Sequence, residues 1–267
     1  MSLSVLMLGP GTSISHAAIN ILSKNGCMVA WVGEDITRFY AQGMGETYKA
    51  YKLIQQAQLV CDTEKRKKVV VAMYRMRFDE ELEDNLTLPQ IRGHEGVRMR
   101  NAYAYWSRQT GVNWEGRQYN FQKWGGDPIN RALSTANAIL NAVCYTVIVT
   151  TGYSPALGFI HQGRQLSFVY DIADLYKTET TIPIAFKATA ESASGGVDLE
   201  RKVRMECRKT FHEYKLMERL LPDIAEVLGV SDDTGESPDE LEGRIVTLAV
   251  GTEDGSFSWE PERQGER

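Results

Sequence analysis

The spacing of hydrophobic and polar residues changes once along the chain, near residue 45. Before this point the apolar residues form short continuous runs bounded by turn residues, a pattern typical of strands. After it they recur every three or four positions, which is typical of amphipathic helices. The sequence therefore predicts an α+β protein, with a partial N-terminal β domain over residues 1–45 and a larger all-helical domain over residues 46–230.

Turn and capping residues divide these patterns into expected elements. Ser13 or Ser15 can cap a helix that stops at Gly26, and Gly43 and Gly45 are expected to form the linker between the two domains. The expected strands cover residues 3–8, 27–33 and 36–41, and the expected helices of the second domain cover residues 47–60, 64–82, 88–110, 128–151, 167–177, 179–192 and 197–229.

The helix over residues 128–151 differs from the others because it is apolar on most sides. Asp127 provides a cap for its start, and Pro128 suits its first turn, where a missing N–H costs nothing. A helix without a polar face is usually surrounded by other elements. We therefore expect it to be the central core helix of the second domain.

The net charge of −5 is concentrated at the C-terminus. Residues 232–267 contain 11 Asp and Glu against 3 Lys and Arg, so the rest of the chain has a net charge of +3. Residues 231–267 are therefore predicted to be an acidic flexible tail. The mildly basic body permits binding to nucleic acid without demonstrating it.

Composition also bears on the compartment. The sequence has no apolar run of about 18 residues, so we expect no membrane span. It shows neither a secretory signal nor a Cys-x-x-Cys pair. Its scattered cysteines lie among apolar residues and are expected to be reduced and buried, which favours the cytoplasm: Cys27, Cys61, Cys144 and Cys207.

Candidate chemistry is concentrated in the stretch from residue 158 to residue 177. It contains His161 and then Asp171 and Asp174, which share one face of a helix because they are three residues apart. Two carboxylates on a largely apolar helix need a nearby cation. This cation has two possible identities. It could be an Arg or Lys side chain in an ion pair, which is the commoner arrangement, or a divalent metal with His161 as a third ligand.

Glu95 is a second candidate. It lies between Gly93 and Gly96 in a predicted helix, where each glycine costs about 1 kcal/mol relative to alanine. Such glycines are accepted where another group must approach the helix backbone closely. Two roles for Glu95 are equally consistent with residues 92–100. It could be a metal ligand close to the phosphates of a bound nucleic acid, or it could form a local salt bridge with a neighbouring arginine. The flanking arginines are Arg92, Arg98 and Arg100.

Three blocks of sequence together resemble the CRISPR-associated integrase family Cas1, in its type I-E form. They are the SHAA helix with the VAWVGE strand, the RGHEG helix, and GFIHQG followed by SFVYDIAD, at residues 15–34, 92–96 and 158–174. The order and spacing of the glutamate, histidine and aspartate blocks are specific, and the similarity runs from about Leu3 to about Leu228.

The resemblance implies that Glu95, His161 and Asp174 are catalytic metal ligands and that Asp171 supports them. It implies Mg²⁺ or Mn²⁺ as the cofactor, because hard carboxylate oxygens suit both ions and one imidazole favours Mn²⁺. The reaction implied is a transesterification that joins the 3′-hydroxyl ends of spacer DNA to phosphodiesters of the CRISPR repeat. Arg92, Arg98 and Lys177 are expected to contact phosphates.

The resemblance also implies partners: spacer and repeat DNA, Cas2 and a second copy of the chain. The family's β domain begins several strands before Leu3, so the chain is expected to be shortened at its N-terminus. Residues 244–250 form a strand-like segment at the position of the tail that docks on Cas2 in this subtype. Two alternatives remain, a metal-dependent nuclease of branched DNA and a non-catalytic helical DNA-binding scaffold.

Overall fold

The computed structural model describes residues 5–25, 27–32, 39–43, 50–78, 86–117, 127–192 and 198–230. The N-terminal part contains a three-stranded sheet in the order β1-β2-β3. Strands β1 and β2 are parallel and are joined through helix α1, whereas β2 and β3 are antiparallel. The bounds are Val5–Leu8 for β1, His16–Lys24 for α1, Met28–Val32 for β2 and Phe39–Gly43 for β3.

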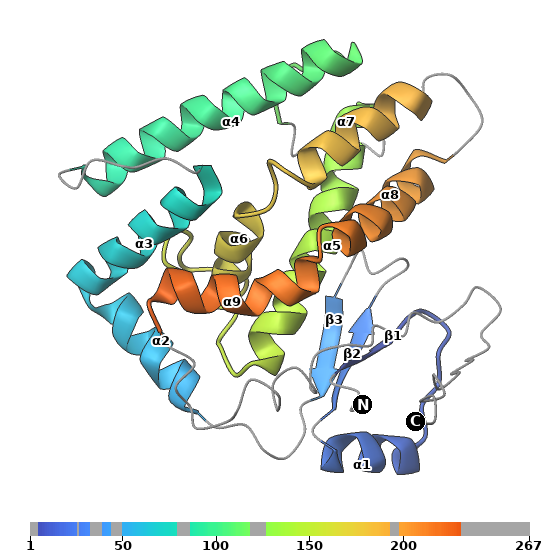
Figure 1. The fold of residues 1–267 in the computed structure, drawn as a ribbon. Coiled ribbons are helices and arrows are strands. Elements are labelled where there is room, and N and C mark those ends of the chain that lie inside the picture. Colours follow the sequence, from blue (N-terminus) through green and yellow to red (C-terminus); the bar gives the residue numbers. More distant parts are fainter. Residues whose placement is uncertain are drawn as a thin grey trace, which may run out of the picture.

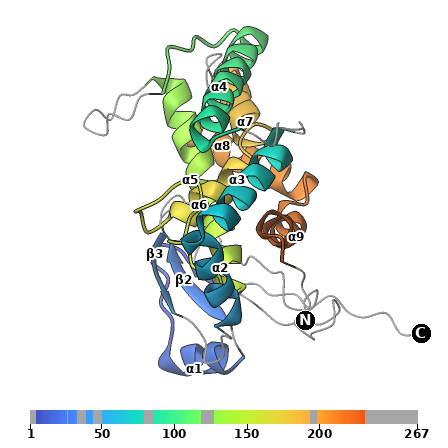
Figure 2. The same ribbon diagram turned by 90° about the vertical axis from the view of Figure 1, so that its left-hand side faces the viewer.

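The rest of the described chain is helical, which confirms the predicted α+β class (Figure 1). The sheet and α1 lie at one end of the molecule, and α4 lies at the other end (Figure 2). The helices are α2 (Tyr51–Cys61), α3 (Thr63–Phe78), α4 (Leu88–Thr110), α5 (Pro128–Thr150), α6 (Ser167–Asp174), α7 (Thr181–Ser192), α8 (Leu199–Glu213) and α9 (Leu216–Leu228).

Helix α5 is the central helix, as predicted. Its start is capped by Asp127, whose side chain accepts a hydrogen bond of 2.8 Å from the backbone N–H of Asn130. Its N-terminal half packs into one apolar cluster with α7 and α8, and its C-terminal half packs into a second with β2, α3, α6 and α9. The helix is long and apolar enough to cross a membrane by composition, but it is mostly buried within the protein, as a core helix is.

The predicted helix over residues 197–229 is wrong, because the structure has two helices there. Lys215 separates α8 from α9 and adopts a left-handed backbone conformation with φ of 50°. The break has a packing reason. Val203 and Cys207 of α8 face one apolar cluster, whereas Leu220 and Ile224 of α9 face the other. A straight helix could not bury both apolar stripes.

Other boundaries differ in smaller ways. Gly43 is the last residue of β3 rather than part of a linker, and α6 ends at Asp174 rather than at Lys177. The domain boundary near residue 45, part of the strand over 36–41 and the end of the helix over 64–82 fall at least partly outside the described residues. So does the tail over 231–267, with its segment 244–250. The three-part division of the chain stays a prediction.

The cysteines give a direct test of this packing. Cys27, Cys144 and Cys207 are buried as expected, but Cys61 is exposed because it ends α2 at the turn into α3. Burial raises the pKa of Cys27 to about 11 and that of Cys207 to about 12. We therefore expect one of the four thiols to react rapidly with an aromatic disulfide reagent at about pH 8, since the thiolate is the reactive form.

The measurement is the absorbance of released thiolate in native protein and in guanidinium chloride, where all four thiols should react. Cys61→Ser should remove the rapid phase in the native protein. Rapid reaction of two or more thiols in the native protein would contradict the packing described here.

Candidate functional site

The loop that contains His161 is folded around the carboxylate of Asp171, a fully buried residue of α6. One carboxylate oxygen accepts hydrogen bonds from the backbone N–H groups of Phe159 (2.5 Å) and Ile160 (3.1 Å). The other accepts from the backbone N–H of His161 at 2.9 Å. Three successive amides therefore point at one side chain, which fixes the path of the loop between α5 and α6.

Asp171 also orients the imidazole of His161. Nδ1 of His161 lies 2.8 Å from Asp171 Oδ1, and because a carboxylate only accepts, Nδ1 carries the proton. The hydrogen bond to Asp171 raises the pKa of His161 above its ordinary value, against an opposing effect of burial. Nε2 keeps a free lone pair in the neutral ring. A histidine held through one nitrogen by a carboxylate is typical of metal-binding histidines.

Asp174 ends α6 one turn beyond Asp171 and contacts two cations. Its Oδ1 lies 2.5 Å from Lys177 Nζ, and its Oδ2 lies 3.8 Å from Arg77 Nη1. Burial alone would raise the pKa of Asp174, but the charges of Lys177 and Arg77 outweigh it and lower the pKa below its ordinary value. The charge of His161 acts in the same direction, so Asp174 and His161 lie within electrostatic reach of each other.

Glu95 meets the same arginine from α4. One oxygen of Glu95 accepts from Nη1 of Arg77, and the other accepts from the hydroxyl of Tyr74 at 2.7 Å. Glu95 and Asp174 therefore both contact a single nitrogen of Arg77, although they are far apart in the sequence. The structure brings the two acids together at Arg77, and His161 is held on the loop that folds onto Asp171, one turn before Asp174 in α6.

Arg77 is a residue of the candidate site that the sequence analysis missed. A cation beside the acids was expected, but the candidates near Glu95 were its own neighbours on the helix. The actual partner comes from α3. The approach of a metal or phosphate to the helix at Gly93 stays a prediction; among the described residues, a β-carbon there would meet no atom within 4 Å outside its own helix.

The types of side chain at the site suit a divalent ion, although their positions in the structure do not form a complete coordination site. Among the described residues, no three Asp, Glu, His or Cys side chains lie close enough together to hold a metal ion. The donors nevertheless fit Mg²⁺ or Mn²⁺, since two carboxylates and one oriented imidazole approach the same region. Arg77 and Lys177 now neutralise the carboxylates that a metal would use.

Arg92, Arg98 and Lys177, the residues expected to contact phosphate, do not share one environment in the structure. Lys177 is paired with Asp174, as noted above. Arg98 lies 4.7 Å from the ring centre of Phe78, in a cation–π contact. The side chain of Arg92 is outside the described part of the structure.

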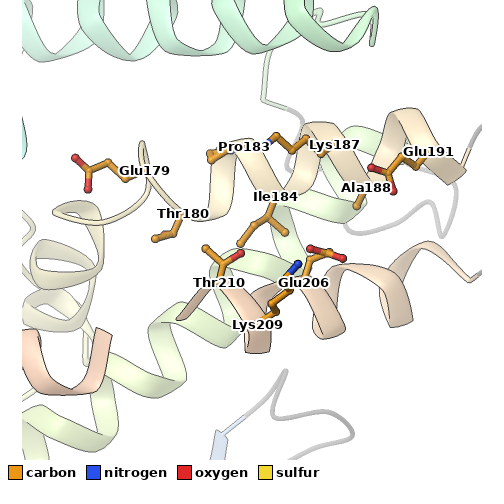
Figure 3. A pocket seen from close by; sticks show the side chains of 10 residues that line it. All are labelled: Glu179, Thr180, Pro183, Ile184, Lys187, Ala188, Glu191, Glu206, Lys209 and Thr210. Carbon is orange, nitrogen blue, oxygen red and sulfur yellow. The ribbon is translucent and has the colours of Figure 1, made fainter. Parts of the chain in front are cut away.

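A separate hollow of about 350 Å³ lies between α7 and α8 (Figure 3). Glu95, His161 and Asp174 do not line it. Its charged lining residues are Glu179, Glu191, Glu206, Lys187 and Lys209. Three carboxylates against two ammonium groups make it a poor match for a DNA phosphate, so the catalytic candidates remain on α4, on α6 and on the loop before α6.

Comparison with known proteins gives one consistent result. A family model described as CRISPR associated protein Cas1 matches residues 63–202, which include all three candidate ligands. CRISPR-associated endonuclease Cas1 2 of Thermus thermophilus is 48% identical over 275 residues, covering 97% of this chain and 84% of that protein. CRISPR-associated endonuclease Cas1 of Escherichia coli is 40% identical over 240 residues, covering 90% and 78%.

Solved structures agree with the sequence comparison. The crystal structure of a TtCas1–DNA complex superposes with a TM-score of 0.74 at 51% identity, covering 85% of this chain and 84% of that chain. A casposase bound to its integration product shares the fold, with a TM-score of 0.52 at 18% identity.

The small sheet, the helical domain and the gathered acids thus define a CRISPR-associated protein. The chain belongs to the Cas1 family.

Proposed function

We propose that this chain is a metal-dependent DNA integrase and endonuclease of CRISPR adaptation. It joins the 3′-hydroxyl ends of spacer DNA to phosphodiesters of the CRISPR repeat by transesterification. The observation that carries the proposal is the approach of Glu95 and Asp174 to one nitrogen of Arg77, while Asp171, one turn before Asp174 in α6, orients the ring of His161. The endonuclease names of the relatives and the DNA in the TtCas1 complex support the same substrate class.

Glu95, Asp174 and Nε2 of His161 would hold Mg²⁺ or Mn²⁺. When bound, the ion supplies Lewis acidity, which favours ionisation of an attacking hydroxyl and offsets charge at the phosphorus. Asp171 keeps the proton of His161 on Nδ1, so that Nε2 is the free donor. Lys177 holds Asp174 in place and lies beside the proposed phosphate path, on which Arg92 and Arg98 are the other proposed contacts.

The proposed assembly follows from the family. We place the chain in the type I-E form, as a cytoplasmic homodimer that binds Cas2 and both spacer and repeat DNA without a membrane. That subtype rests on the three sequence blocks at residues 15–34, 92–96 and 158–174, since the Thermus thermophilus relative is more similar to this chain, at 48% identity, than the E. coli relative, at 40%. The position and acidic composition of the tail support docking on Cas2.

Single substitutions test the metal site. Glu95→Ala, His161→Ala and Asp174→Ala should each lower Mn²⁺-dependent strand transfer by at least about 100-fold, because even residues that only orient metal ligands contribute 10–100-fold. The assay is joining of labelled spacer duplex to a supercoiled repeat plasmid, with circular dichroism to verify folding. Glu191→Ala is the matched control, since it removes an exposed carboxylate that is paired with Lys202 of α8 and lines the separate hollow between α7 and α8.

Unchanged strand transfer in any two of the three ligand variants would rule out the metal assignment and leave a DNA-binding scaffold. A nuclease of branched DNA is the other candidate, and the endonuclease names of the relatives favour testing it. The same plasmid assay separates the two activities. An integrase yields joined strands, whereas a nuclease that uses water as the nucleophile yields only cleaved ones.

A further inference from the structure

Arg77 has an unusual environment for a charged side chain. It lies in the last turn of α3, and only 3% of its side chain is exposed. Its Nη1 contacts Glu95 and Asp174, its Nη2 lies 2.9 Å from the sulfur of Met99, and its guanidinium lies 5.1 Å from the ring centre of Phe78. A buried cation is tolerated here because two carboxylates balance its charge.

The pairing of Arg77 is incomplete. An arginine that serves only to pair a carboxylate usually grips both of its oxygens through two N–H groups. Here Glu95 gives one oxygen to Nη1 and the other to the hydroxyl of Tyr74. Nε of Arg77 is buried and has no hydrogen-bond partner in the part of the chain that the structure describes. Glu95 is therefore held by two separate donors, and its contact with Arg77 can be exchanged while its contact with Tyr74 is kept.

Nη1 of Arg77 contacts Oε1 of Glu95 and Oδ2 of Asp174, so a positive charge already occupies the place where an ion shared by these two carboxylates would lie. We propose that Arg77 is a built-in competitor of the metal. It balances Glu95 and Asp174 when no metal is bound, and it must release Glu95 before the ion can take all three ligands. This inference rests on the proposed function. It assigns to Arg77 two effects of opposite sign, stabilisation of the metal-free protein and weakening of metal binding.

Replacement by methionine separates these effects, because methionine keeps an apolar chain beside Met99 and Phe78 but has no charge. In EDTA, Arg77→Met should have a lower melting temperature than the unchanged protein, since Glu95 loses its cation and Asp174 keeps only Lys177. Its Kd for Mn²⁺, measured by calorimetry or by the electron paramagnetic resonance of free Mn²⁺, should be about 10-fold lower, as expected for removal of one nearby positive charge. Saturating Mn²⁺ should then raise its melting temperature by more than it raises that of the unchanged protein.

Arg131→Met is the matched control. It removes an arginine paired with Glu200 at 3.1 Å on the outside of α5, and it should leave Mn²⁺ affinity unchanged. If Arg77→Met does not fold, Arg77→Lys decides the question. Lysine keeps the charge but replaces the planar guanidinium by one ammonium nitrogen on a flexible stem, so Mn²⁺ should bind about 3-fold more tightly than to the unchanged protein.

Unchanged or weaker Mn²⁺ binding in the folded arginine variant would overturn the competitor role. Glu95→Ala, measured alongside, distinguishes the two proposals. If Glu95→Ala weakens Mn²⁺ binding and Arg77→Met does not strengthen it, only the competitor role fails. If Glu95→Ala leaves Mn²⁺ binding unchanged, the metal site itself fails.

Discussion

Gly158→Ala is expected to destabilise the protein by about 3 kcal/mol and to abolish strand transfer. A β-carbon at residue 158 would lie 2.3 Å from the carbonyl oxygen of His161 and 2.7 Å from Cβ of Ser167. The first of these atoms belongs to the backbone and cannot rotate away. The loop would have to move, and with it the imidazole that Asp171 orients.

Thermal unfolding measures the first effect and plasmid joining the second. A loss of about 3 kcal/mol corresponds to a fall of about 10 °C in Tm for a chain of this size. Gly93→Ala is the control, because a β-carbon there meets no atom within 4 Å outside its own helix. Alanine inside α4 should stabilise the protein by about 0.5–1 kcal/mol. Equal effects of the two substitutions would show that residue 158 is not closely packed.

These two glycines illustrate what the sequence could reveal. Glycine is disfavoured inside a helix, so a glycine in a predicted helix indicates a special role. For this reason the sequence analysis predicted that a metal or phosphate approaches the helix at Gly93. A glycine in a loop gives no such indication, because glycine is common in loops. The close contacts at Gly158 involve residues 161 and 167, and they exist only once the loop has folded onto α6.

Local rules predicted the elements well where the determinants are local. Ser15 and Asp127 cap their helices as expected, and the apolar stripe of α5 identified the core helix. The break at Lys215 was missed because its cause is tertiary. The apolar stripes of α8 and α9 face different clusters, and each stripe alone has ordinary helical spacing.

In the candidate site, too, contacts between residues close in sequence were predicted and contacts between helices were not. The sequence indicated that Asp171 and Asp174 need a positive partner, and that His161 lies near them. Lys177, the nearer cation of Asp174, lies three residues away in the sequence, but nothing in the sequence indicated that Arg77 reaches both Asp174 and Glu95 from α3. Contacts between helices depend on how the helices pack, and no periodicity within one helix contains that information.

Asp171→Asn is the second substitution with a large expected effect. The carboxylate accepts from three backbone N–H groups and from Nδ1 of His161, whereas an amide has one accepting oxygen and would direct its NH₂ group at some of these donors. Leaving buried donors unpaired should cost about 2–4 kcal/mol, or about 10 °C in Tm. Strand transfer should also fall, by about 10–100-fold, because Asp171 orients a proposed ligand.

A positioning role predicts one further result that loss of stability alone does not. The hydrogen bond to Asp171 raises the pKa of His161, so in EDTA the pKa of His161 measured by NMR should lie above 6.5 and should fall in Asp171→Asn. Asp62→Asn is the control, because Asp62 also accepts from two backbone N–H groups, at 3.0 Å each, but is exposed. That change should cost less than about 1 kcal/mol, since water can replace the lost acceptor. If the pKa of His161 is the same with Asp171 or asparagine, the carboxylate supports the loop without orienting the ring.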